Sequence, residues 1–247
     1  MSIASAEDVR SALDSGEETL NLTVSRGGKQ RLLTLTPTQT KNGPRMGVFL
    51  RQGIAGIGTV TWYDPDTGAF GALGHGVCDS TGLLSMTRGS AYEASVTEVK
   101  KGKSGDPGQL KGTARSLEPI APLLRNTAQG VFGVTTRGWR GEALPVAEYS
   151  QIHTGTASIR AQTCGQVQEY SVEILKIYPQ TRSDCRNFLL KVTDPELLST
   201  TGGIVQGMSG SPILQDGHLI GAVTHVLVND PTAGYGIYIQ NMLDAAA

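Results

Sequence analysis

The chain has little of what marks membrane, nucleic-acid-binding or secreted disulfide-rich proteins. No apolar run approaches the roughly 20 residues that span a bilayer, and the first residues, MSIASAEDVR, lack the pattern of a signal peptide. The formal net charge is −1, so the chain has no basic field of the kind that nucleic acids bind. We therefore expect no nucleic-acid partner. An export signal or anchor outside these residues stays compatible with the sequence.

Cysteine is also scarce. The three cysteines, Cys78, Cys164 and Cys185, match no zinc-binding spacing, and their odd number argues against a complete disulfide framework. A bridge between Cys164 and Cys185 is one alternative, and buried or free thiols are the other. The sequence contains no H-E-x-x-H motif, and its glycine-rich stretches do not open a helix as a nucleotide-binding loop would. We therefore expect neither a metal nor a cofactor.

Glycine is abundant, with 32 in 247 residues, and it accompanies valine, threonine and isoleucine along the chain. This pattern indicates many short strands joined by tight turns, and DPDTG (64–68) is a strong hairpin signal. Within this β-rich part of the chain, one short helix is expected, at 195–200. The sequence predicts an all-β fold consisting of a barrel or two packed barrels. Strand-like segments lie at 92–100, 131–138, 143–152, 155–162, 168–179, 187–193, 212–228 and 235–243.

The first 37 residues have a different pattern. Ser5 is a candidate N-cap for a helix with apolar residues at helical spacing, and two alternating runs follow on either side of a Gly27-Gly28 turn. Helix, strand, turn and strand are too small a unit to bury a core. This segment resembles the C-terminal remnant of a PDZ domain. We predict the remnant at 1–37, a linker rich in turn-forming residues at 38–45, and a β domain at 46–247.

The sequence GMSGSP (207–212) lies between two apolar runs. A serine hydroxyl becomes a nucleophile only beside a base, and it needs backbone N–H groups directed at the developing oxyanion. The glycines on either side of Ser209 let the backbone turn sharply, which makes the amides of Gly207 and Ser209 candidate oxyanion donors. An ordinary hairpin turn in a glycine-rich chain would also produce this short motif, so it requires a partner elsewhere in the sequence.

Four histidines are candidates for that partner. His75 lies in GALGHG (71–76), where small neighbours on both sides leave an imidazole open to a cleft. His153 and His218 follow polar or turn residues and are predicted to lie on the surface. His225 ends the strand that follows the serine motif. It is a candidate contact for the substrate residue before the scissile bond, with an internal hydrogen bond within the barrel as the alternative role.

The combination of AGIGTVTWYDPDTGAFGALGHGVCD with GGIVQGMSGSPILQDGHLIGAVTHVLVND closely resembles the stage IV sporulation protein B family of serine peptidases. KGKSGDPGQLKG (101–112) fits the same family, and the resemblance covers nearly the whole chain. It implies a chymotrypsin-like double β-barrel in which His75 is the general base and Ser209 the nucleophile of a serine endopeptidase.

The resemblance also implies that Asp194 is the acid that orients His75. This aspartate lies closer to the serine than is usual in trypsin-like enzymes, and it could instead cap the short helix that begins at Pro195. The other carboxylates between the histidine and the serine are Asp79, Asp106 and Asp184.

Members of this family are exported into the space between the forespore and mother-cell membranes, and they cut themselves near the N-terminus. By cleaving a membrane-bound regulatory subunit they release an intramembrane protease that activates a late sigma factor. The resemblance implies the same substrate, location and membrane-anchored full-length form here. A homo-oligomer is a further expectation, through exchange of the N-terminal segment with a second copy. Two other functions stay open, namely a non-catalytic peptide-binding β domain and a self-processing domain without turnover.

Overall fold

The computed structural model describes residues 3, 6–26, 29–48, 54–79, 82–86, 88–139, 141–163, 165–182 and 184–247. The chain divides into two compact units, Met1–Ala55 and Gly56–Ala247. The N-cap expected at Ser5, the turn expected at Gly27-Gly28 and the cysteine at position 164 lie outside the described residues. Among the described helices, none has the length and apolar character that crossing a membrane requires.

The first unit contains helix α1 (Ala6–Leu13) and an antiparallel pair of strands, β1 (Leu20–Arg26) and β2 (Lys29–Leu35), in the order that the sequence predicted. The segment predicted as a linker, 38–45, instead forms a second hairpin from β3 (Thr38–Thr40) and β4 (Gly43–Arg45). The Thr40 hydroxyl stabilises its two-residue turn, because it donates to the Gly43 carbonyl at 2.7 Å and accepts from the Asn42 amide. Gly43, which follows the turn and pairs with Thr40, has φ +95°, a conformation that glycine adopts readily, and this favours the hairpin. Identity with a PDZ remnant stays a prediction.

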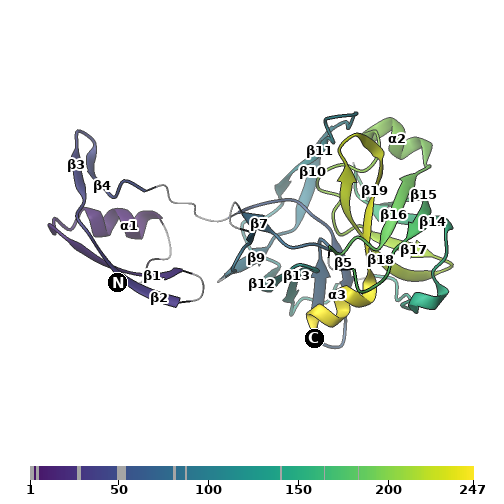
Figure 1. Ribbon diagram of the computed structural model, residues 1–247, viewed down its shortest axis with the longest axis horizontal. Coiled ribbons are helices and arrows are strands. Elements are labelled where there is room, and N and C mark those ends of the chain that lie inside the picture. The colour runs from purple at the N-terminus through teal and green to yellow at the C-terminus, as the bar shows by residue number, and fades with distance from the viewer. Residues whose placement is uncertain are drawn as a thin grey trace. The chain divides into compact units, whose positions relative to one another are not determined.

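The second unit begins with a five-stranded antiparallel sheet in the order β5-β6-β13-β12-β9 (Figure 1). The turn predicted at 64–68 joins β5 to β6, where the Asp64 carboxylate accepts from the Asp66 amide and the Thr67 hydroxyl. Two separate antiparallel pairs, the short β7–β8 and the longer β10–β11, accompany the sheet. The strands of this half are β5 (Val60–Tyr63), β6 (Ala69–Ala72), β7 (Cys78–Asp79), β8 (Gly82–Leu83), β9 (Gly89–Ala91), β10 (Ala94–Lys100), β11 (Gln109–Ala114), β12 (Ala121–Thr127) and β13 (Gly130–Val134).

The remaining strands close into a six-stranded antiparallel barrel in the order β14-β15-β16-β19-β18-β17 (Figure 1). The predicted all-β fold is therefore confirmed; of its two halves, this one is a closed barrel and the other is the five-stranded sheet. Helix α3 (Ile239–Ala246) packs against β18 and β19 of the barrel and against β6 and β13 of the sheet, so it ties the two halves together. The barrel strands are β14 (Gly155–Ala161), β15 (Gln168–Ile177), β16 (Phe188–Val192), β17 (Pro212–Gln215), β18 (His218–Leu227) and β19 (Asp230–Tyr238).

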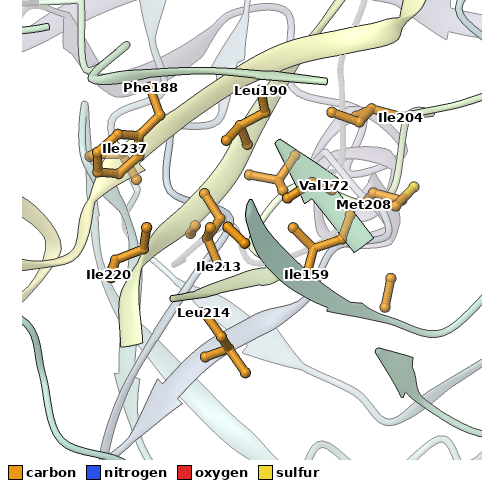
Figure 2. Packing of buried hydrophobic residues seen from close by; sticks show 14 of the residues in the cluster. Ile159, Val172, Phe188, Leu190, Ile204, Met208, Ile213, Leu214, Ile220 and Ile237 are labelled. Carbon is orange, nitrogen blue, oxygen red and sulfur yellow. The ribbon is translucent and has the colours of Figure 1, made fainter. Parts of the chain in front are cut away.

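The hydrophobic core lies mainly inside this barrel. Figure 2 shows Phe188 and Leu190 of β16 near Ile237 of β19, with Ile213 of β17 among them, and these four side chains are fully buried. Burying a large aliphatic or aromatic side chain contributes about 2 kcal/mol, so the barrel is the most heavily stabilised part of the chain. Met208, beside Ser209, is also fully buried in this core.

Two strand predictions in this unit are wrong. Residues 143–152 contain only a bridge at Val146 and a 3₁₀ turn, η1 (Tyr149–Gln151). At 235–243, β19 ends at Tyr238 and α3 begins at once, because Ile239 and Met242 are spaced to bury one helical face. The predicted helix near 195–200 is confirmed as α2 (Pro195–Thr201).

Candidate active site

The serine turn, residues 207–211, places one polar side chain outward between buried neighbours. Met208 is fully buried in the barrel core and Gly210 is buried, whereas Ser209 is only half-buried. The turn is closed by a hydrogen bond from the Ser211 amide to the Met208 carbonyl at 3.0 Å. Anchoring the residues on either side of Ser209 fixes where its hydroxyl can lie.

The serine turn packs directly against the strands that lead to His75. The Thr59 amide donates to the Ser209 carbonyl at 2.9 Å, and the Thr61 hydroxyl donates to the Gly210 carbonyl at 2.8 Å. A Cβ on Gly210 would lie 2.1 Å from the Thr59 carbonyl oxygen and 2.6 Å from the Leu73 amide nitrogen. Only glycine permits this approach, which joins the barrel to the sheet two residues before His75.

The histidine segment, residues 73–77, leaves β6 through a sharp turn. Leu73 and Gly74 both have positive φ, +71° and +69°, a conformation that costs a non-glycine residue free energy. A Cβ on Gly74 would meet Ile237 and Thr224 at 2.9 Å, so the segment lies against β18 and β19. The His75 ring follows immediately and is half-buried.

The His75 Nδ1 atom lies 3.0 Å from the Gly76 carbonyl oxygen. A carbonyl can only accept, so this contact assigns the proton to Nδ1 and leaves Nε2 as the basic nitrogen. A general base for a serine hydroxyl needs this tautomer. Here a main-chain carbonyl, rather than a carboxylate, selects it.

His225 lies beside His75. Their ring centroids are 5.2 Å apart at an interplanar angle of 41°. Burial, followed by the positive charges of His75 and Arg186, lowers the pKa of His225 to about 4, against a weaker opposing effect of Asp184. His225 is therefore neutral near pH 7, so it adds no positive charge to repel a protonated His75. Its Nδ1 is buried and has no hydrogen-bond partner among the described residues.

The Ser209 hydroxyl donates to the Thr224 carbonyl oxygen at 3.0 Å. Thr224 precedes His225 on β18, so the hydroxyl is held at the strand that carries His225, by a main-chain carbonyl rather than by an imidazole. Hydrogen bonds of a catalytic group often form only when substrate is bound.

The predicted oxyanion donors, Gly207 and Ser209, have available amides. Within the described part of the chain, neither N–H donates a hydrogen bond, whereas the amides of Met208, Gly210 and Ser211 all do. Gly207 has φ +100°, and its α-carbon faces Leu110 of β11. Unpaired amides on both sides of buried Met208 are the arrangement that an oxyanion site requires.

Asp194, the acid predicted to orient His75, has a different set of partners. One carboxylate oxygen accepts from the Glu196 and Leu197 amides at 3.0 Å each, which makes Asp194 the N-cap of α2, and the other accepts from the Ser171 amide at 3.3 Å. No hydrogen bond or ion pair joins Asp194 to His75, although both residues are described. Of the two roles that the sequence allowed for Asp194, the structure gives it the helix cap.

Two of the other candidate carboxylates from the sequence are paired with cations elsewhere. Asp106 pairs with Lys100 at 2.8 Å, and Asp184 pairs with Arg182 at 2.6 Å. His153, predicted to lie on the surface, is exposed and bonded to Asp216 at 2.8 Å. That contact and the Thr154 carbonyl, which is the larger cause, raise the pKa of His153.

Asn126 of β12 is a site residue that the sequence gave no reason to select. Its side chain accepts from the Val77 amide at 2.8 Å and donates to the carbonyls of Val77 and Leu84. It therefore holds the chain that immediately follows His75. These partners lie more than forty positions away in the sequence, so no local pattern could have revealed the contact.

Comparison with known proteins identifies relatives of this chain. The family model described as "SpoIVB peptidase S55" matches residues 42–243. Among solved structures, the inactive form of the Rv3671c protease has 15% identity and a TM-score of 0.38, over 56% of this chain and 73% of that one. The active form of Rv3671c from M. tuberculosis has 14% identity and a TM-score of 0.40, over 56% of this chain and 63% of that one. No curated protein matches the chain.

Proposed function

The chain belongs to the SpoIVB peptidase S55 family, and from this premise we propose which of its residues perform the chemistry. It is a serine peptidase. Ser209 is the nucleophile, His75 is the general base, and the amides of Gly207 and Ser209 form the oxyanion site. The observation that carries this assignment is the direct packing of the serine turn against the strands before His75, through the bond from the Thr59 amide to the Ser209 carbonyl at 2.9 Å.

The reaction begins when a peptide carbonyl lies beside the serine turn. The Ser209 hydroxyl leaves the Thr224 carbonyl, gives its proton to Nε2 of His75, and attacks the carbonyl carbon. The negative charge that develops on the carbonyl oxygen is stabilised by the two unpaired amides, each of which typically contributes about 3 kcal/mol. Collapse of the tetrahedral intermediate transfers the proton from His75 to the leaving amine and leaves an acyl-enzyme. Water repeats the sequence and releases the acid.

Orientation of His75 is assigned to the Gly76 carbonyl, which accepts the Nδ1 proton at 3.0 Å. A carbonyl dipole fixes the tautomer but stabilises an imidazolium less than a carboxylate does. Asp194 supports the site from a distance, because it caps the helix that precedes the serine turn. His225 lines the position next to His75 and contacts the substrate residue before the scissile bond.

The decisive experiment uses a fluorophosphonate, which labels an activated serine irrespective of peptide preference. We expect the purified chain to be labelled and to cleave a peptide mixture, and Ser209→Ala to lose both properties. Ser211→Ala is the matched control, because Ser211 lies in the same turn with a fully buried side chain. Labelling of Ser209→Ala would refute the assignment. Labelling without cleavage of added peptide, together with a cut in the chain itself, would identify a self-processing domain.

From the family we propose the biological role. The full-length protein is membrane-anchored and acts between the forespore and mother-cell membranes, where it cuts itself near the N-terminus. It then cleaves a membrane-bound regulatory subunit of an intramembrane protease, so that a late sigma factor is activated. Replacement of the chromosomal copy by Ser209→Ala should block processing of that sigma factor, and processing at the normal rate would refute the role. Light scattering of the purified chain tests whether it forms a homo-oligomer.

A further inference from the structure

The outer surface of the barrel carries a row of side chains that begins at His225. In the strand register, His225 of β18 is opposite Tyr235 of β19, which is opposite Leu189 of β16, which is opposite Lys176 of β15. Directly opposite residues in a sheet point to the same face. None of the four is buried, whereas Phe188 and Leu190, on either side of Leu189 in β16, are fully buried in the core. The row therefore runs outward from the histidine pair.

Cations cover the aromatic rings of this surface. The Arg186 guanidinium carbon lies 5.0 Å from the Tyr235 ring centroid. Beyond it, the Arg182 guanidinium carbon lies 4.4 Å from the Tyr178 centroid, and the Lys176 ammonium lies 5.0 Å from the same ring. These side chains share Tyr235 and Lys176 with the row described above. We call the five of them the basic row: Lys176, Tyr178, Arg182, Arg186 and Tyr235.

The charges of the basic row are only partly neutralised. Arg182 is paired with Asp184 through two contacts, at 2.6 and 2.9 Å. Arg186 has no ion pair with any described residue, and its Nε is buried without a hydrogen-bond partner. A guanidinium nitrogen that is buried without an acceptor is costly. Asp184 accepts from the main-chain amide of Arg186, and the hydrogen bond from Arg182, followed by weaker effects that include the charge of Arg186, lowers the pKa of Asp184. Because the Asp184 carboxylate is bonded to the guanidinium of Arg182, a bound anion can still bond directly to the guanidinium of Arg186.

The loop that carries Arg186 is held in place. The fully buried side chain of Asn187 donates to the carbonyls of Pro179 and Gln180 at 2.8 and 3.4 Å and accepts from the Tyr238 amide at 3.0 Å. Main-chain bonds link Asn187 to Tyr178 and Gly236. The guanidinium is thus presented from a fixed backbone, which reduces the entropy lost on binding.

An extended peptide has a place to bind beside this row. β17 pairs with β18 only as far as Ala222, so from Thr224 onward the edge of β18 next to Ser209 has no strand partner among the described residues. A peptide can add antiparallel to this edge with its scissile carbonyl at Ser209. The peptide residues before the scissile bond then lie alongside β18 as far as Val226. A peptide residue opposite His225 then lies on the face of Tyr235 and Arg186.

We propose that Arg186 makes this peptidase selective for an acidic side chain two to four residues before the scissile bond, with Lys176 and Arg182 extending the positive surface. The carboxylate accepts from the guanidinium of Arg186 and rests beside Tyr235. This specificity relies on the proposed catalytic role of Ser209. The experiment must therefore give different results when the specificity is wrong and when the nucleophile is wrong.

The test uses peptidyl phosphonates, which react once with an activated serine and need no turnover. Pairs of inhibitors differ only in Glu against Gln at the second, third or fourth residue before the phosphonate. We expect the Glu member of at least one pair to inactivate the protein about 10-fold faster, as one charged contact is typically worth about that factor. The ratio should fall toward one in Arg186→Gln, and in Arg186→Glu a Lys-bearing inhibitor should become the faster one.

Lys191→Gln is the matched control. Lys191 is also an exposed cation on β16, but it lies opposite Ala233 rather than Tyr235. It should keep the ratio of the unmodified protein. A fluorophosphonate without a peptide measures only the reactivity of the nucleophile. Absence of that labelling would therefore contradict the assignment of Ser209, not the specificity. A ratio near one in the labelled, unmodified protein, or a ratio that survives in Arg186→Gln, would overturn the specificity.

Discussion

The serine turn and the histidine segment meet at one point, yet they are held in different ways. The serine turn belongs to a closed barrel, and the side chain of Met208, next to the nucleophile, is fully buried in its core. The histidine segment leaves an open sheet through two residues of positive φ and is fixed by backbone contacts and the side chain of Asn126. The nucleophile thus depends on the hydrophobic core, whereas the base depends on a few polar contacts. Mutations beside the nucleophile should therefore lower stability and activity together, whereas mutations beside the base should lower activity more than stability.

The largest effect is expected where the two regions touch. In Gly210→Ala the new Cβ would overlap the Thr59 carbonyl oxygen at 2.1 Å, and the residue would have to adopt φ +91°. We expect a loss of about 3 kcal/mol in the free energy of unfolding and at least about a 10²-fold fall in kcat, measured by urea denaturation and peptide cleavage. Gly217→Ala also has positive φ, +76°, but open space around it, so it should cost about 1 kcal/mol and keep activity. Equal losses in the two variants would show that the contact with the sheet is unimportant.

The next effect tests the polar support of the base. Asn126→Ala would leave the Val77 amide and the carbonyls of Val77 and Leu84 without their partner. We expect a loss of about 2 kcal/mol in stability and, because His75 loses its position, a fall of about 10²-fold in kcat with a smaller change in KM. The matched variant is Asn187→Ala, whose side chain supports the barrel loop beside the basic row. It should destabilise the protein and alter KM more than kcat. A normal kcat in Asn126→Ala would contradict the role of Asn126.

A third experiment uses pH. The folded-state pKa of His225, about 4, is below its ordinary value of 6.5. The unfolded chain therefore binds this proton at a higher pH than the folded protein does, so stability falls as the pH decreases from about 6.5 to about 4. Because the ring is only half-buried, we expect a contribution of about 1 kcal/mol over this range. Urea denaturation at pH 7 and pH 4.5 should show a smaller loss for His225→Gln. Identical pH profiles for His225→Gln and the unmodified protein would refute the shift.

The smallest effect concerns Asp194 and decides between its two roles. As an N-cap it can be replaced by Asn, which also accepts from the amides of Glu196 and Leu197. We expect Asp194→Asn to keep stability and kcat within a few-fold, and Asp194→Ala to lose about 1 kcal/mol. An acid that orients a catalytic histidine behaves differently, because its Asn variant loses about 10⁴-fold in kcat. A loss of that size in Asp194→Asn would restore the role that the family resemblance implied.

Much of this architecture could be predicted from local sequence. The DPDTG turn, the strand alternation of β14 to β16 and the Asp-Pro start of α2 each depend on neighbouring residues, and all lie where predicted. The errors have local causes as well. Residues 143–152 have apolar residues but find only a bridge to the barrel, and the apolar run after Tyr238 changes from strand to helical spacing within one residue. Periodicity in so short a run does not distinguish the two.

The sequence alone determined the all-β fold, the Ser209 turn between two glycines and the position of His75 between glycines at the end of an apolar strand, because these follow from backbone freedom and side-chain alternation over a few residues. Only the tertiary structure decided the partners. In the structure, Asp194 caps helix α2, and the Gly76 carbonyl fixes the tautomer of His75. Asn126 holds the chain after His75, and Arg186 lies over the ring of Tyr235, on the face of the barrel that carries His225. Such contacts join segments distant in the chain, and their energies depend on distance and burial, which appear only when the barrel closes against the sheet.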